Sequence, residues 1–182
     1  GARLARKQCF GLCFENKDSW KAAMKTPEMM ESGKDAMKFY TAGKIWHADK
    51  FKTLRDTIGL PVQARWIDLT QDDPIVTHNK SLLWQMCYED VRDSDFVLLY
   101  SEDESEEQRG ALVEIGMAYG MGKPVYAVGK CRSIKPNAIS DVAFTHHHLW
   151  TWLETDNLTK GAFYAIASQL GRRGRETLQK VA

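Results

Sequence analysis

The chain has 182 residues, and its 25 Lys and Arg nearly balance its 24 Asp and Glu, which leaves a net charge of +1. This length suits one domain with a short appendage. The near-neutral charge excludes a protein that binds by neutralising many phosphates, so we expect no long nucleic acid as a partner. No apolar run reaches the ~20 residues needed to span a bilayer, so we expect no membrane partner.

The four cysteines, at positions 9, 13, 87 and 131, offer neither a second close pair for zinc nor a disulfide framework. We therefore predict reduced thiols and a cytoplasmic protein. The run His146-His147-His148 does not change this view, because consecutive strand residues point to opposite faces and do not converge on one ion. We predict no metal and no cofactor.

Residues 1–36 are polar, Met-rich and interrupted by Gly and Pro, and we interpret them as an N-terminal extension. The main domain is predicted over 37–170 and a basic tail over 171–182. The domain's elements are predicted in chain order from periodicity and breaker residues: a strand at 37–42, a helix at 47–58, a strand at 62–67, a helix at 78–93, a strand at 96–100, a helix at 110–121, a strand at 124–128, a further strand within 144–150 and a helix at 158–170.

Strands and helices therefore alternate with short connections. The run Phe96-Val97-Leu98-Leu99-Tyr100 is apolar throughout, which is typical of a strand buried on both faces. We predict an α/β protein with a doubly wound, mostly parallel sheet of four to five strands and helices on both faces, of flavodoxin or Rossmann type. Ligands of such sheets bind beyond the carboxyl ends of the strands, which selects four segments: 41–47, 65–68, 101–110 and 129–132.

Glu114 is the first candidate catalytic residue, because its helix begins directly after the loop at 101–110. The pattern places it in or near the first helical turn, where the helix dipole favours a carboxylate. Gly110 and Ala118 lie four residues to either side on the same face, which leaves room for a ligand above the acid. The alternative is a glutamate that only satisfies the helix end.

Asp90 is the second candidate. It follows Leu83, Met86 and Cys87 at the spacing i, i+3, i+4 and i+7, so it continues an apolar, inward-facing stripe. Buried acids are rare unless they are paired or functional. The alternative is that Asp90 caps a neighbouring segment of backbone.

Two other predicted strand ends offer binding residues. After the first strand, Gly43 allows close backbone approach, while Lys44 and His47 suit contact with a phosphate or a base. At the end of the second strand, Arg65 offers a cationic donor and Trp66 a stacking surface. Packing alone explains His47 and Trp66 equally well.

The segment Arg109-Gly-Ala-Leu-Val-Glu114-Ile-Gly-Met-Ala-Tyr-Gly-Met-Gly-Lys-Pro-Val125, preceded by Asp90 and the strand Asp95 to Tyr100, resembles the signature of nucleoside 2-deoxyribosyltransferases. It is equally similar to that of 2'-deoxynucleoside 5'-phosphate N-hydrolases. The resemblance covers roughly residues 37–170. It implies that Glu114 attacks the anomeric carbon while Asp90 assists the leaving base. Two such carboxylates can run a double displacement through a covalent glycosyl-enzyme.

One position departs from that signature. Six residues before the nucleophile, the transferases typically carry an Asp and the nucleotide hydrolases a Ser, whereas this chain has Gln108. A neutral side chain there removes a charge that would repel phosphate. We expect the preferred substrate to carry a 5'-phosphate, with donors supplied by Lys44, Arg65, Arg109 and the helix start at Gly110. Acidic residues at 102–107 oppose this unless they point to solvent.

The sequence thus predicts an enzyme that cleaves or transfers the N-glycosidic bond of a nucleoside or nucleoside 5'-monophosphate. The alternative is a catalytically weak nucleotide-binding or sensing module on the same fold, which Gln108 keeps open. The resemblance also implies a homodimer or higher homo-oligomer, for which Trp150 and Trp152 offer interface surface.

Overall fold

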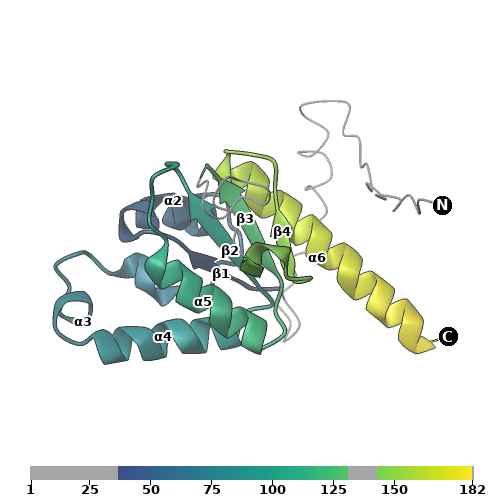
Figure 1. The fold of residues 1–182 in the computed structure, drawn as a ribbon, viewed down its shortest axis with the longest axis horizontal. Helices are drawn as coiled ribbons and strands as arrows, with labels where there is room; N and C mark the ends of the chain where they lie inside the picture. The colour runs from purple at the N-terminus through teal and green to yellow at the C-terminus, as the bar shows by residue number, and fades with distance from the viewer. Residues whose placement is uncertain (1–36, 131–142, 182) are drawn as a thin grey trace. The chain divides into compact units, whose positions relative to one another are not determined.

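The computed structural model describes residues 37–130 and 143–181 (Figure 1). The predicted N-terminal extension, with Cys9 and Cys13, lies outside the described residues. Cys131 and Arg132, the last two residues of the predicted edge segment 129–132, also lie outside the described residues.

Four parallel strands form the sheet, in the spatial order β1 (Phe39–Ala42), β2 (Phe96–Ser101), β3 (Val125–Gly129) and β4 (Trp150–Trp152). Every residue of the first three strands is buried, as the apolar runs predict. Phe39 pairs with Phe96 in register, and their rings stack 5.1 Å apart. The hydrophobic core runs through β1, β2 and β3.

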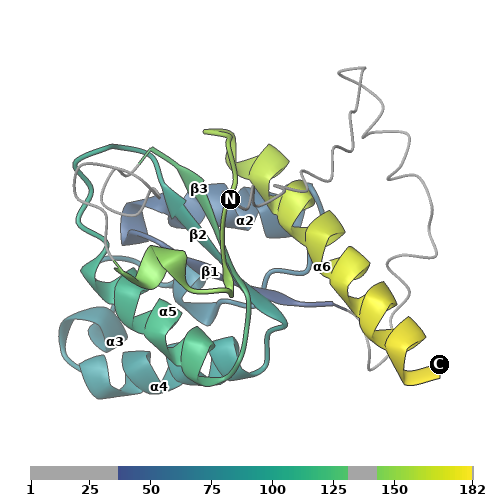
Figure 2. The ribbon, with the colours of Figure 1, turned by 45° about the vertical axis from the view of Figure 1, so that its right-hand side comes forward.

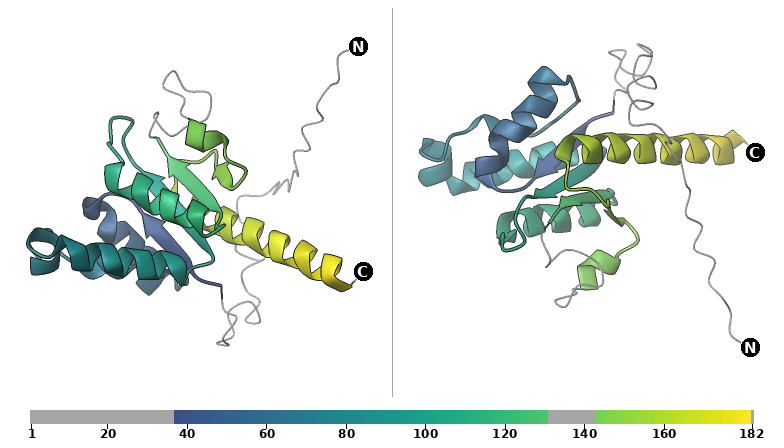
Figure 3. Two further views of the ribbon diagram at one scale, coloured as in Figure 1. Left: turned by 60° about the horizontal axis from the view of Figure 1, so that its bottom comes forward. Right: turned by 90° about the horizontal axis from the view of Figure 1, so that it is seen from above.

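Helices cover both faces of this sheet (Figure 3). The helices α4 (Lys80–Arg92) and α5 (Arg109–Gly120) pack on each other over one face. On the other face, α6 (Leu158–Val181) crosses β2 and β3. The predicted doubly wound, parallel α/β fold is therefore confirmed. Short helical segments complete the described chain: η2 (Ile45–His47), α2 (Ala48–Lys52), η3 (Thr53–Thr57), η4 (Arg65–Asp68), α3 (Pro74–Thr77) and η6 (Ala143–His146).

The predicted strand at 62–67 is wrong. Only Val62 forms a bridge, pairing in parallel with Phe39, and the chain then turns into η4. The cause is a side chain: the backbone N–H of Arg65 donates to Asp90 Oδ2 at 2.7 Å instead of to a neighbouring strand. A strand needs its amides for the ladder, so this bond ends the extended segment.

The C-terminal part of the domain also differs from the prediction. Residues Ala143–His146 are helical, and the last strand is confined to Trp150–Trp152. The helix predicted at 158–170 continues to Val181, so the predicted basic tail at 171–182 is helical over most of its length (Figure 2). Arg173 forms an ion pair with Asp95, which ties this continuation to the start of β2.

At two glycines a neighbouring residue leaves no room for a Cβ. Gly161 of α6 lies so close to β3 that an added Cβ would be 2.4 Å from Val128 Cγ2. Gly129, the last residue of β3, has a φ of 111°. A Cβ at that position would lie 1.7 Å from the carbonyl oxygen of Ser101, so only glycine fits there. β2 and β3 therefore meet tightly at their carboxyl ends.

Candidate active site

Glu114 lies on the buried face of α5, which it shares with Ala111, Ile115 and Ala118. The predicted partner Gly110 is exposed instead, at the start of the helix. Glu114 is the sixth residue of α5, so it lies beyond the first turn in which the sequence placed it. The helix dipole acts mainly within the first turn, so it does not set the charge of this carboxyl group.

Burial sets the protonation of Glu114 instead. It raises the pKa of this carboxyl group from 4.5 to about 7, although hydrogen bonding from Tyr40 and Cys87 opposes the rise. The Tyr40 hydroxyl donates to Oε1 at 2.7 Å. Near neutral pH the group is thus divided between its acid and its carboxylate form. A carboxyl group poised in this way can act as a nucleophile or exchange a proton.

A pocket of about 150 Å³ lies against Glu114. Its described lining is mostly apolar and comes from five parts of the chain: Gly43 and Ile45 after β1, Trp66 and Leu69 in and after η4, Val76 in α3, Leu83 and Cys87 in α4, and Glu114 in α5. Two of the four segments predicted at the sheet edge, 41–47 and 65–68, contribute to this lining. A planar, weakly polar group suits such a wall.

Trp66 is oriented for this wall by one hydrogen bond. Its indole Nε1 donates to the carbonyl oxygen of Thr41 at 2.8 Å, and Phe51 meets its ring edge to face. The side chain is buried and fixed, so it is both packed and part of the pocket. The two alternatives for Trp66 are therefore compatible.

Sequence reasoning missed two neighbours of Glu114. Tyr40 stands in the fully buried strand β1, and burial raises its pKa well above 10. A tyrosine in an apolar, buried strand needs a partner for its hydroxyl, which was the available signal. Cys87 lies on the inward stripe beside the carboxyl group, and burial and Glu114 together raise the pKa of its thiol to about 12. The thiol is therefore protonated.

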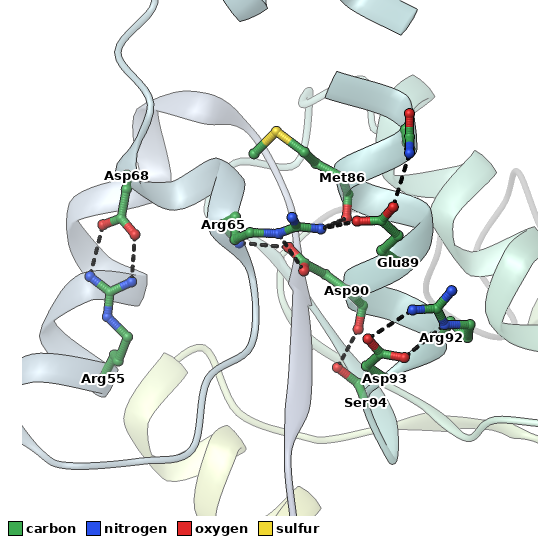
Figure 4. A network of polar contacts seen from close by, with 10 residues as sticks. Arg55, Arg65, Asp68, Met86, Glu89, Asp90, Arg92, Asp93 and Ser94 are labelled. Carbon is green, nitrogen blue, oxygen red and sulfur yellow. Dashed lines mark hydrogen bonds and ion pairs between the residues drawn. The ribbon is translucent and has the colours of Figure 1, made fainter. Parts of the chain in front are cut away.

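Asp90 is buried, as its stripe predicts, but it belongs to a different cluster (Figure 4). Its Oδ2 accepts from the backbone of Arg65, and its Oδ1 accepts from Arg65 Nε at 2.8 Å. The same guanidinium also donates to Glu89 and to the carbonyl oxygen of Met86. The structure thus favours the alternative in which Asp90 binds a neighbouring backbone segment.

This second cluster has a pocket of its own, of about 470 Å³. Arg55 lines it too and is held by Asp68 through two bonds of 2.8 Å. Both arginines are therefore committed to carboxylates, and Asp90 lines this pocket while Glu114 lines the other. The structure does not bring the two predicted catalytic acids to one pocket.

The remaining predicted donors are also occupied or turned outward. His47 is 1% exposed, and its Nε2 lies 2.7 Å from Glu106 Oε1. The Lys44 ammonium lies over the Trp46 ring. Arg109 is 85% exposed and pairs with Glu107 at 2.9 Å. Of the predicted binding residues, the structure brings Gly43 and Trp66 to Glu114.

Gln108 is buried at the N-terminal end of α5 but does not cap it. Its Nε2 donates to Glu106 Oε2 at 3.2 Å, and its Oε1 has no partner among the described residues. Glu106 therefore points inward, contrary to the solvent-facing orientation that phosphate binding at this edge requires.

Among the described residues, no group of three or more His, Cys, Asp or Glu side chains could hold a metal ion. Within the same ranges, no helix is both long enough and apolar enough to cross a membrane. Neither protein-family models nor curated proteins nor solved structures match this chain.

Proposed function

We propose that the protein cleaves or transfers the N-glycosidic bond of a nucleoside, with Glu114 as the nucleophile. One observation carries the proposal: a buried carboxyl group of raised pKa, bonded to Tyr40, forms one wall of an apolar pocket at the carboxyl edge of a parallel sheet. The resemblance of 109–125 to nucleoside 2-deoxyribosyltransferases and their N-hydrolase relatives supports the same reaction class.

In this mechanism the ionised Glu114 attacks the anomeric carbon and the electron pair of the C–N bond leaves with the base. The ester formed on Glu114 is then attacked by water, which gives hydrolysis, or by a second base, which gives transfer. Tyr40 keeps one carboxylate oxygen in place through its 2.7 Å bond. Trp66 offers a flat surface for the base.

The arrangement favours a nucleoside over a nucleoside 5'-monophosphate. Arg65 and Arg55 are bound by carboxylates, Arg109 points to solvent, and Glu106 faces inward at the sheet edge. A phosphate would have to displace these carboxylates from their cations. The 5'-phosphate preference expected from the sequence is therefore not part of this proposal.

The test is base release from a panel of nucleosides and matched 5'-monophosphates, followed by chromatography. Glu114→Gln should fold normally and lose base release by at least about a thousand-fold, because the covalent step is removed. A trapped glycosyl ester on Glu114, detected by mass spectrometry, would identify the nucleophile directly. A folded Glu114→Gln variant with near wild-type turnover would overturn the assignment.

A binding or sensing module is the second candidate. The raised pKa of Glu114 favours it if this carboxyl group is protonated in the complex with the ligand. If the carboxyl group stays protonated with a ligand bound, it donates a hydrogen bond and attacks nothing. Calorimetry separates the two, since a sensing module would bind nucleosides tightly while the panel shows no base release at any pH.

A further inference from the structure

Glu106 is unlike its neighbours in the loop between β2 and α5. The side chain is 8% exposed, whereas that of Glu102 is 53% exposed and that of Glu107 is 65% exposed. Composition alone groups these residues into one acidic loop. The structure separates Glu106 from the others as the member that points into the protein.

Both carboxylate oxygens of Glu106 accept several hydrogen bonds. Oε1 accepts from Trp46 Nε1 at 3.1 Å and bonds His47 Nε2 at 2.7 Å. Oε2 accepts from Ser101 Oγ at 3.1 Å, from the Glu102 backbone at 3.0 Å and from Gln108 Nε2 at 3.2 Å. One side chain therefore joins the segment after β1, the end of β2 and the start of α5.

This geometry fixes the direction of each bond. Burial favours the neutral form of Glu106, but donation from Trp46, from the Glu102 backbone and from His47 outweighs it and lowers the pKa. A carboxylate has no proton to give, so His47 donates from Nε2 and Gln108 presents its NH₂ group. The carbonyl oxygen of Gln108 is thereby turned away from Glu106, and this buried oxygen has no hydrogen-bond partner among the described residues.

Three of these contacts, those with Trp46, His47 and Gln108, bear on the Glu114 pocket. Trp46 and His47 belong to η2, whose first residue, Ile45, lines that pocket together with Gly43. Gln108 directly precedes α5, which carries Glu114. A shift of Glu106 would therefore move the η2 wall and the nucleophile relative to each other.

We propose that Glu106 is a positioning residue that clamps η2 to the start of α5, and so sets both the opening of the Glu114 pocket and the orientation of the Gln108 amide. The clamp itself is independent of the reaction. Its effect on turnover rests on the proposed function.

The first experiment needs no activity and uses Cys87 as a reporter, because its thiol lines the same pocket. Alkylation by N-ethylmaleimide is followed by peptide mass spectrometry, which separates Cys87 from the other cysteines. In Glu106→Gln the amide cannot accept all five donors, so we expect the η2 wall to loosen and Cys87 to react at least about ten-fold faster. Glu107→Gln, the same change at the next position, where the side chain is exposed, should react as the wild type does.

The second experiment measures kcat and KM for the nucleoside that the panel identifies. Glu106→Gln should lower kcat/KM by about ten-fold or more, chiefly through KM, because the η2 wall lines the substrate pocket while Glu114 is retained. Glu106→Asp, which keeps the carboxylate, should restore part of the loss. A structural defect alone would not follow the charge in this way.

If Glu106→Gln does not fold, Trp46→Phe is used in its place. This substitution removes one exposed donor to Glu106, and it should also speed Cys87 alkylation, but by less. Faster Cys87 alkylation without base release from any nucleoside would uphold the clamp and refute the proposed function. Wild-type alkylation in both Glu106→Gln and Trp46→Phe would refute the clamp, whatever the activity.

Discussion

Glu114 and Asp90 are both buried carboxyl groups, but Asp90 has a cationic partner and Glu114 has only neutral ones. Asp90 faces a guanidinium and a backbone amide, which stabilise its charge. Glu114 faces a hydroxyl and a thiol in an apolar pocket, and burial there raises its pKa to about 7. The sequence identified both residues from helical spacing, but spacing does not show which partner stands opposite.

The raised pKa of Glu114 predicts a pH dependence of stability. The folded protein holds this proton more tightly than the unfolded chain, whose carboxyl has a pKa near 4.5, so the free energy of unfolding should fall as pH rises from 4.5 to about 7. Glu114→Gln has no such proton to lose. At about 1.4 kcal/mol per pH unit, the variant should be more stable than wild type above neutrality by at most about 3 kcal/mol. Urea unfolding across this range measures the difference, and a constant difference between the two proteins would contradict the assigned pKa.

The same titration predicts the rate profile. Base release should increase as pH rises through about 7, because only the ionised Glu114 attacks. Single-turnover kinetics against pH test this without interference from product release. A rate that is flat between about pH 5 and pH 8 would show that another group carries the reaction.

Tyr40 and Glu106 mark the limit of sequence reasoning at the residue scale. Tyr40 and Glu114 are 74 positions apart, and Trp46 and Glu106 are 60 apart, so the contacts exist only after the sheet has formed. Periodicity shows that a side chain points inward but not what it meets. Arg65, a predicted phosphate donor, shows the same limit, because the carboxylates that bind it, Glu89 and Asp90, come from α4.

At the scale of elements, η4 stands where the sequence predicted a strand. The Asp90 carboxylate holds the Arg65 backbone in this turn, and α4 supplies that carboxylate. Apolar alternation over 62–67 suits a strand locally, so a tertiary hydrogen bond decided the outcome. The buried strands β2 and β3, whose signal is local and continuous, were predicted to within one residue at each end.

Asp90→Asn tests whether this link is structural. An amide cannot accept from both Arg65 donors without turning its NH₂ toward one of them, so the variant should lose about 2–4 kcal/mol of stability. Asp93→Asn, which breaks an exposed pair with Arg92, should lose much less stability, because solvent screens that pair. Chemical denaturation compares the two. Should Asp90→Asn keep its stability and slow only substrates with poor leaving bases, the acid role implied by the resemblance would be restored.

The contact between α6 and β3 supports a matched pair of glycine substitutions. Gly161→Ala places a methyl group against Val128, and we expect a loss of about 1–3 kcal/mol. Gly174→Ala, in the same helix with nothing within 4 Å, should gain up to about 1 kcal/mol from helix propensity. Thermal unfolding of both variants measures the difference. Equal effects would mean that α6 does not pack on β3 as described.

At the scale of the whole molecule, the exposed apolar surface lies away from the predicted interface. Trp150 is buried and Trp152 half-buried. Large apolar side chains are exposed instead on the adjacent helices α4 and α5: Trp84, Tyr88, Leu112 and Val113. Exposed large apolar side chains on neighbouring helices are typical of a surface that pairs with another chain.

We therefore predict a homodimer that pairs through α4 and α5. The combined variant Trp84→Glu and Val113→Glu should be monomeric, because charges at the centre of an apolar interface are costly to bury. Tyr164→Glu, on α6, should remain dimeric and serves as the control. Light scattering at micromolar concentration distinguishes the states. A fully active wild-type monomer would contradict the predicted homodimer.

The conformation of Gly129 has a consequence for engineering the substrate range. A library that alters the loop after β3 is an obvious route to new specificity, since that loop leaves the same edge of the sheet as the Glu114 pocket. At position 129 of such a library, only glycine would be compatible with the fold, because any Cβ would overlap the Ser101 carbonyl oxygen. The same oxygen accepts from the Lys130 backbone at 2.9 Å, so position 130 is the first at which side-chain diversity is compatible with the strand pairing.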